Sequence, residues 1–183
     1  AFVPRLMEEY EVPGVQVAFV RNGRLLYSQG FGRESVWSTR PVTTQSLFEA
    51  ASLSKPVSAY TSLRLMESGV LELDRDVGLG LEPPWLDVDD GGKAPRITLR
   101  QLLSHQAGFS NNVRRSSHWP EDKPGEGFAY SGEGYEYVGY VLEAYEQQRF
   151  ADVALKRTLA PLGMTSSGFA LPPELVRRMV HGH

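Results

Sequence analysis

The alternation of apolar and polar residues near the N-terminus predicts a short helix followed by a two-stranded hairpin. Apolar side chains recur at helical spacing over residues 2–10, which is typical of an amphipathic helix. Val15–Arg21 then alternates apolar and polar residues as a strand does. Asn22-Gly23 favours a tight turn because both positions tolerate positive φ, and Arg24–Gly30 supplies the return strand. Since an isolated hairpin is marginal in water, we expect further strands or a helix to cover it.

The longest helical pattern covers residues 53–66. Its apolar residues nearly encircle the segment, which predicts a buried central helix rather than a surface helix. Pro56 is compatible with this helix because a proline in the first turn has no helical acceptor to lose. Gly69 offers a stop, since glycine takes the left-handed conformation that ends helices.

The rest of the chain predicts further helices joined by polar, turn-rich segments. Thr98–Gln101 form a capping box, which opens a short helix ended by Gly108. Further helices are predicted over residues 134–145, 152–159 and 172–180. The fold class is therefore α+β, with an N-terminal hairpin and a mainly helical region over residues 48–180.

Composition excludes several functional classes. With 183 residues, 41% hydrophobic and 22% charged, the chain is an ordinary globular domain or one compact part of a larger one. The net charge of −3 and the lack of a basic patch argue against a nucleic-acid partner. No apolar run reaches the roughly 18 residues of a membrane span.

The absence of cysteine removes disulfides, thiolate nucleophiles and cysteine zinc sites. The four histidines do not form a metal-binding pattern, so we expect no metal or cofactor. The compartment stays open: periplasmic or secreted if a signal peptide was removed, cytoplasmic otherwise. The oligomeric state stays open as well.

Ser52 and Lys55 are the first candidates for chemistry. They lie three positions apart where the long helix begins, so their side chains can meet. A serine hydroxyl is a poor nucleophile unless a base lies beside it. A lysine becomes such a base when burial or a second cation favours its neutral form. The spacing is common by chance, so a pair without catalytic function is the alternative on these residues alone.

Five stretches, in order along the chain, resemble the serine β-lactamase and penicillin-binding-protein superfamily. The resemblance is closest to its class C β-lactamase-like branch, which includes esterases and D-amino-acid peptidases. The stretches are VPGV at 12–15, FEAASLSKP at 48–56, LLSHQAG at 102–108, PGEGFAYSG at 124–132 and APLGMT at 160–165. The resemblance implies a β-lactamase/transpeptidase-like fold and one domain over 1–183, with helix and hairpin in 1–47 and the active-site serine in 48–183.

The resemblance also implies roles for three residues. Ser52 would attack a carbonyl and form an acyl-enzyme, while Lys55 takes or relays its proton. Tyr130 matches the tyrosine of the family's Tyr-x-Asn motif and would share the proton with Lys55 before protonating the leaving group. The pairing is chemically sensible because the lysine charge lowers the phenol's pKa. The implied substrates are small molecules: esters, β-lactams or D-amino-acid amides.

Substrate contacts are less regular. Gly132 stands where the family often has an asparagine that binds the substrate's amide, and this departure favours esters. Asn111 and Asn112 fall where class C-like enzymes place a polar substrate contact. The family counterpart of His105 ends a helix and is mainly structural.

No stretch matches the family's third motif, which lies on a sheet strand and helps form the oxyanion hole. We therefore expect this chain to be the N-terminal portion of its domain, with an incomplete antiparallel sheet, an exposed strand edge and poor solubility or no activity in isolation. Gly132 and the missing motif also support an alternative, a non-catalytic penicillin-binding-like module that binds a ligand or partner.

Overall fold

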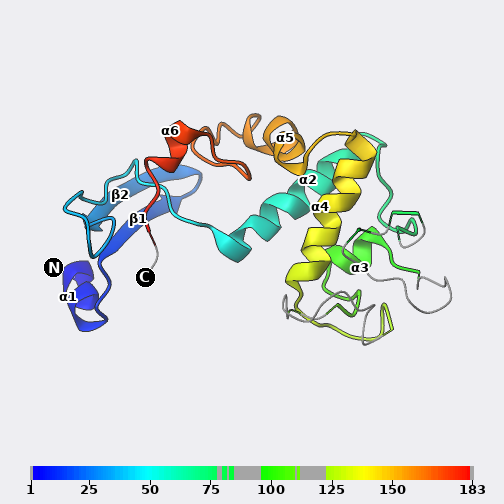
Figure 1. Cartoon of the computed structure of the whole chain (residues 1–183), viewed down its shortest axis with the longest axis horizontal. Coiled ribbons are helices and arrows are strands. Elements are labelled where there is room, and N and C mark those ends of the chain that lie inside the picture. Colours follow the sequence, from blue (N-terminus) through cyan, green and yellow to red (C-terminus); the bar gives the residue numbers. More distant parts are fainter. Residues whose placement is uncertain are drawn as a thin grey trace. The chain divides into compact units, whose positions relative to one another are not determined.

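The computed structural model describes residues 2–77, 80–81, 83–84, 96–109, 111 and 123–181. The chain forms two compact units. One unit comprises Ala1–Ala50 with Ala170–His183, and the other comprises Ala51–Phe169. Figure 1 traces the elements of each unit along the chain. The single domain over 1–183 stays a prediction.

The first unit contains the predicted helix and hairpin. Helix α1 covers Phe2–Glu9, and strands β1 (Gly14–Arg21) and β2 (Arg24–Gly32) pair antiparallel. Asn22 and Gly23 have φ values of 51° and 71°, so the turn takes the positive-φ form that this dipeptide favours. The described residues contain no further strand in this sheet, which agrees with the expected two-stranded hairpin.

The last helix of the first unit is shorter than predicted. Helix α6 covers Pro173–Val176 and does not continue to Val180. Beyond it the backbone bonds to Leu47 on both sides, because Leu47 N donates to Arg178 O (2.8 Å) and Val180 N donates to Leu47 O (2.7 Å). These hydrogen bonds to Leu47 take the place of the helical bonds that a further turn of α6 would make.

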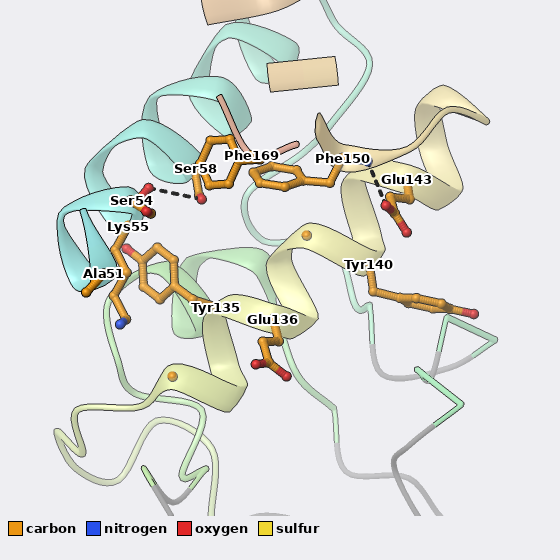
Figure 2. Close-up of a pocket in the computed structure, with 12 residues that line it drawn as sticks. Ala51, Ser54, Lys55, Ser58, Tyr135, Glu136, Tyr140, Glu143, Phe150 and Phe169 are labelled. Carbon is orange, nitrogen blue, oxygen red and sulfur yellow. Dashed lines mark hydrogen bonds between the residues drawn. The ribbon is translucent and has the colours of Figure 1, made fainter. Parts of the chain in front are cut away.

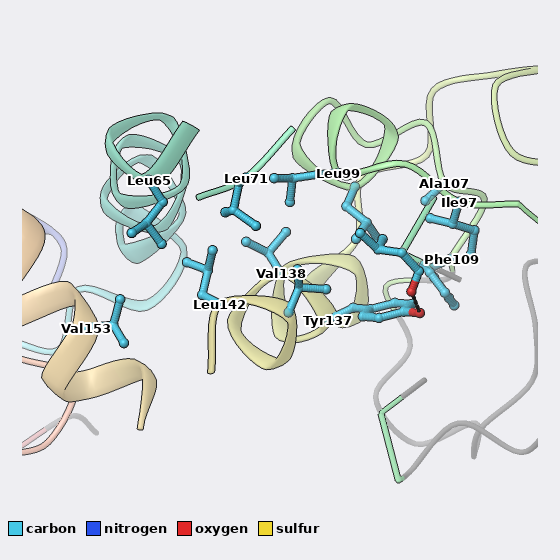
Figure 3. Close-up of a cluster of buried hydrophobic side chains, with 13 residues drawn as sticks. Leu65, Leu71, Ile97, Leu99, Ala107, Phe109, Tyr137, Val138, Leu142 and Val153 are labelled. Carbon is cyan, nitrogen blue, oxygen red and sulfur yellow. Dashed lines mark hydrogen bonds between the residues drawn. The ribbon is translucent and has the colours of Figure 1, made fainter. Parts of the chain in front are cut away.

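The second unit packs helices around a shared core (Figure 3). Its elements are the 3₁₀ turn η1 (Ala51–Leu53), α2 (Ser54–Glu67), α3 (Leu99–Leu103), α4 (Gly132–Glu146), α5 (Phe150–Ala154) and the π-helical turn η2 (Leu155–Leu159) that continues α5. Helix α4 supplies the middle of the core through Tyr137, Val138 and Leu142, all fully buried. The Tyr137 hydroxyl donates to Val77 O at 2.7 Å, so its burial leaves no phenol unpaired.

The prediction that apolar residues bury α2 on all sides is wrong. Its buried residues are Ser58, Thr61, Ser62 and Leu65, whereas apolar side chains including Tyr60 and Leu63 are exposed. Buried hydroxyls are tolerated because they are bonded: Thr61 Oγ1 donates to Val57 O at 2.8 Å and lies 2.7 Å from Thr158 Oγ1. The helix itself, with Pro56 in its first turn and Gly69 just beyond its end, is confirmed.

The capping box of α3 is confirmed, but its predicted end is not. Thr98 Oγ1 accepts a hydrogen bond from Gln101 N (3.2 Å), and the Gln101 side chain accepts one from Thr98 N (2.9 Å). The helix ends at Leu103, well before Gly108. The residue that turns the chain is His105, with a φ of 58°.

Removal of this cap is expected to destabilise the helical unit. Thr98→Ala should lower the free energy of unfolding by about 1 kcal/mol, because the N–H of Gln101 loses its side-chain acceptor. Chemical denaturation of the full-length protein measures the loss. Thr98→Ser keeps the hydroxyl and serves as the control. Equal unfolding midpoints for the alanine and serine variants would contradict the role of the cap.

Candidate active site

Ser52 lies in the 3₁₀ turn η1, directly before α2. The preceding residue, Ala51, has a φ of 43°, in the left-handed region that disfavours any residue with a Cβ. Strained backbone of this kind is concentrated at functional sites, where the surrounding structure maintains it. The sequence carried no signal for this strain. One turn further on, Lys55 Nζ donates a hydrogen bond to Ser52 Oγ at 3.0 Å.

The Tyr130 side chain lies beside Lys55 but comes from a distant part of the chain. It precedes α4, whose N-cap residue Ser131 accepts a hydrogen bond from Gly134 N at 2.9 Å. Lys55 Nζ lies 4.7 Å from the centre of the Tyr130 ring. Hydrogen bonds from the side chains of Lys55 and then Ser52 hold the pKa of Tyr130 below its usual value, against the opposite effect of burial. The structure thus brings Ser52, Lys55 and Tyr130 together.

The Lys55 ammonium determines which chemistry the cluster can perform. Lys55 donates to the oxygen of Ser52 and lowers the pKa of Tyr130, so its ammonium stabilises negative charge on either oxygen. Ser52 also lowers the pKa of the Tyr130 phenol. A proton can therefore pass from the serine to the tyrosine without leaving the cluster, which is the step that activates a serine nucleophile.

The predicted substrate contacts have different outcomes. Gly132 N donates to Asn111 Oδ1 at 2.8 Å, so this asparagine oxygen is engaged at the start of α4. A Cβ at Gly132 would lie 3.3 Å from the same oxygen, and a larger side chain there would require Asn111 to give way. Asn112 lies outside the described residues. Contact of these residues with substrate stays a prediction.

A cavity of about 510 Å³ lies between α2 and α4 and begins beside Lys55 (Figure 2). Its size is that of a small-molecule pocket. The residues lining it are Ala51, Ser54, Lys55, Ser58, Gly132, Tyr135, Glu136, Gly139, Tyr140, Glu143, Phe150 and Phe169. The rings of Phe150 and Phe169 meet edge to face at 4.6 Å, and Glu143 Oε1 accepts from Phe150 N at 2.6 Å. Sequence reasoning did not find this pocket.

The described part of the chain holds neither a candidate metal site nor a helix that could span a membrane. No three or more His, Cys, Asp or Glu residues in the described part of the chain form a group that could hold a metal ion. None of the helices there is long and apolar enough to cross a membrane.

The fold is that of the serine β-lactamase and penicillin-binding-protein superfamily. The sequence model described as Beta-lactamase matches residues 1–183. The chain therefore belongs to the Beta-lactamase family.

Individual relatives agree with this assignment. Penicillin-binding protein 4* of Bacillus subtilis (strain 168) is 28% identical over 203 residues, which cover 97% of this chain and 43% of that protein. A class C beta-lactamase solved in complex with cefoxitin is 25% identical, with a TM-score of 0.80, over 98% of this chain and 52% of that one. SurE solved with D-Leu is 26% identical, with a TM-score of 0.74, over 100% of this chain and 44% of that one. The chain thus spans about half the length of these relatives.

Proposed function

We propose that the protein is a serine hydrolase that works through an acyl-Ser52 intermediate. The observation that carries the proposal is the cluster of three side chains: Lys55 Nζ lies 3.0 Å from Ser52 Oγ and 4.7 Å from the centre of the Tyr130 ring, and both Lys55 and Ser52 lower the pKa of the Tyr130 phenol. A structural serine needs neither a cation nor a phenol of lowered pKa beside it. Perturbed pKa values in such a cluster are typical of catalytic groups.

The cluster supports a two-stage reaction. As Ser52 Oγ attacks the substrate carbonyl, its proton passes to the Tyr130 phenolate, and the Lys55 ammonium stabilises the negative charge beside it. The Tyr130 phenol then protonates the leaving group as the bond between the carbonyl carbon and the leaving group breaks. The acyl group stays on Ser52. In the second stage a water molecule attacks the acyl carbon and gives one proton to the Tyr130 phenolate. Tyr130 delivers this proton to Ser52 Oγ as the bond between Oγ and the acyl carbon breaks, which releases the acid. The cluster thus loses no net proton over the cycle.

Esters are our first choice of substrate, followed by β-lactams and D-amino-acid amides. Gly132 has no side chain with which to bind a substrate amide, and esters lack the amide N–H that such a group recognises. β-Lactams stay in the set because one relative is a penicillin-binding protein and a solved relative holds cefoxitin. D-Amino-acid amides stay because SurE was solved with D-Leu. We propose Asn111, Asn112 and Gly132 as substrate-binding residues.

Covalent labelling tests the proposal. A fluorophosphonate or a fluorescent penicillin should label the full-length protein at one serine, and peptide mapping should place the label on Ser52. Ser54→Ala is the matched control. Ser54 is the first residue of α2, close to Ser52 in the chain, and its loss should not affect labelling. A full-length protein that neither probe labels would instead support the non-catalytic binding module.

A further inference from the structure

His105 makes contacts on both sides of Tyr130 that the proposed mechanism does not use. His105 Nδ1 accepts a hydrogen bond from Ser131 N at 3.0 Å, and His105 O accepts one from Ala129 N at 2.8 Å. These two N–H groups belong to the residues immediately before and after Tyr130. One residue therefore holds the backbone on each side of the phenol.

The His105 ring also contacts the tyrosine itself. The ring centres of His105 and Tyr130 lie 4.6 Å apart with a tilt of 35°, and that of Tyr135 lies 5.1 Å from His105. Contact with both rings limits the directions in which the Tyr130 side chain can rotate. Lys55 approaches the same two tyrosine rings, at 4.7 Å and 5.8 Å. His105 and Lys55 thus restrain Tyr130 together.

The backbone of His105 is strained in support of this arrangement. Its φ of 58° places a residue with a Cβ in the left-handed region, directly after the end of α3. This turn lets both its carbonyl and its ring face residues 129–131. A residue kept in such a conformation commonly has a functional reason.

The bond from Ser131 N requires an unprotonated Nδ1, and the surroundings favour that form. Burial and then the Lys55 charge lower the pKa of His105. The neutral ring carries its proton on Nε2 when Nδ1 accepts, so the acceptor is present at neutral pH.

We infer that His105 is a positioning residue that fixes the Tyr130 phenol against Lys55 and Ser52 by holding the backbone on both sides of it. The inference rests on the proposed function for its effect on catalysis. It goes further in one respect, since it predicts a property of Tyr130 that can be measured without any substrate.

The test compares two substitutions in the full-length protein, one that keeps the hydrogen-bond acceptor and one that removes it. His105→Asn keeps an oxygen that can accept from Ser131 N, and asparagine tolerates positive φ. His105→Phe keeps a ring but removes the acceptor. The phenol of Tyr130 is titrated by ultraviolet absorbance, with the matching Tyr130→Phe variant subtracted to remove the other tyrosines. Lys55, His105 and Tyr135 are the titratable groups that face Tyr130 in the described part of the chain.

In His105→Phe the titration of Tyr130 should move up toward the ordinary tyrosine pKa of about 10, because the phenol no longer stays beside Lys55. In His105→Asn it should remain near that of the unaltered protein. With an ester substrate, kcat of the phenylalanine variant should fall on the order of 10², as a misplaced group does, with KM nearly unchanged. The asparagine variant should recover most of this loss.

An unshifted Tyr130 titration in His105→Phe would overturn the inference, and so would an equal shift in both variants. If the phenylalanine does not fold at this positive φ, His105→Gly replaces it, since glycine adopts that φ without strain. The titration also separates this inference from the proposed function. A shift in His105→Phe in a protein without hydrolase activity would uphold the positioning role and refute the proposed reaction alone.

Discussion

Replacing Ser52 with alanine is expected to abolish hydrolysis in the full-length protein while leaving its fold intact. The substitution removes a single oxygen from an η1 turn, so the packing of α2 is unchanged. Loss of the nucleophile in other serine hydrolases costs roughly 10⁶ in kcat, and we expect a fall of several orders of magnitude here. Steady-state kinetics with an activated ester measures this fall, and a thermal melt confirms that the variant is folded.

Ser54→Ala is the matched control, because Ser54 lies close to Ser52 at the start of α2. Ser54 also lines the α2–α4 cavity, so its loss tests whether any hydroxyl in this neighbourhood can serve. Its activity should stay within a few-fold of the unaltered protein. Substantial ester hydrolysis by Ser52→Ala would remove Ser52 from the mechanism, whatever the control shows.

The parts of the fold that the sequence predicted correctly are those set by neighbours along the chain. The Asn22-Gly23 turn follows from two residues that tolerate positive φ, and the α3 capping box follows from Thr98 and Gln101. Each depends on contacts between residues only a few positions apart. Local patterns of this kind require no knowledge of the remaining fold.

The buried face of α2 could not be predicted because it depends on a distant partner. Thr61 is buried through its hydroxyl contact with Thr158, which lies 97 positions further along the chain. Apolar periodicity does not register the burial of bonded hydroxyls, so it predicted a helix buried by apolar residues all around. The end of α6 has the same origin, since the bridge to Leu47 comes from the other end of the sequence.

In the candidate site, too, the features set by neighbouring residues could be predicted and those set by distant residues could not. The approach of Ser52 and Lys55 follows from helical spacing alone. Tyr130 has no local link to this pair, and only the family resemblance identified it. The positive φ values of Ala51 and His105 carried no signal, because neither alanine nor histidine marks a left-handed position as glycine does.

Lys55 and Tyr130 are expected to act as one unit for proton transfer. Lys55→Ala and Tyr130→Phe should each lower kcat/KM severely, because either change removes one member of the Ser52, Lys55 and Tyr130 cluster. The double variant should be little worse than the poorer single variant, since groups that act together are not additive when mutated. The measurement is a double-mutant cycle on ester hydrolysis.

The pH dependence gives the same pair a second readout. The hydrogen bond from Lys55 is the largest influence that lowers the pKa of Tyr130. In Lys55→Ala this pKa should rise toward its ordinary value, so the phenolate that accepts the serine proton forms only at higher pH. The acid limb of the pH profile of kcat/KM should therefore move in the alkaline direction. A limb that stays in place would show that the Tyr130 phenolate is not the base.

Tyr135→Phe supplies the matched control for the cycle. Its ring lies 5.8 Å from Lys55 Nζ, but its hydroxyl donates to Leu103 O at 3.0 Å instead of joining the cluster. The effects of Tyr135→Phe and Lys55→Ala should therefore multiply, as they do for groups that act independently. If the losses from Lys55→Ala and Tyr130→Phe also multiplied, the two residues would contribute separately, and the shared transfer of the serine proton would be wrong.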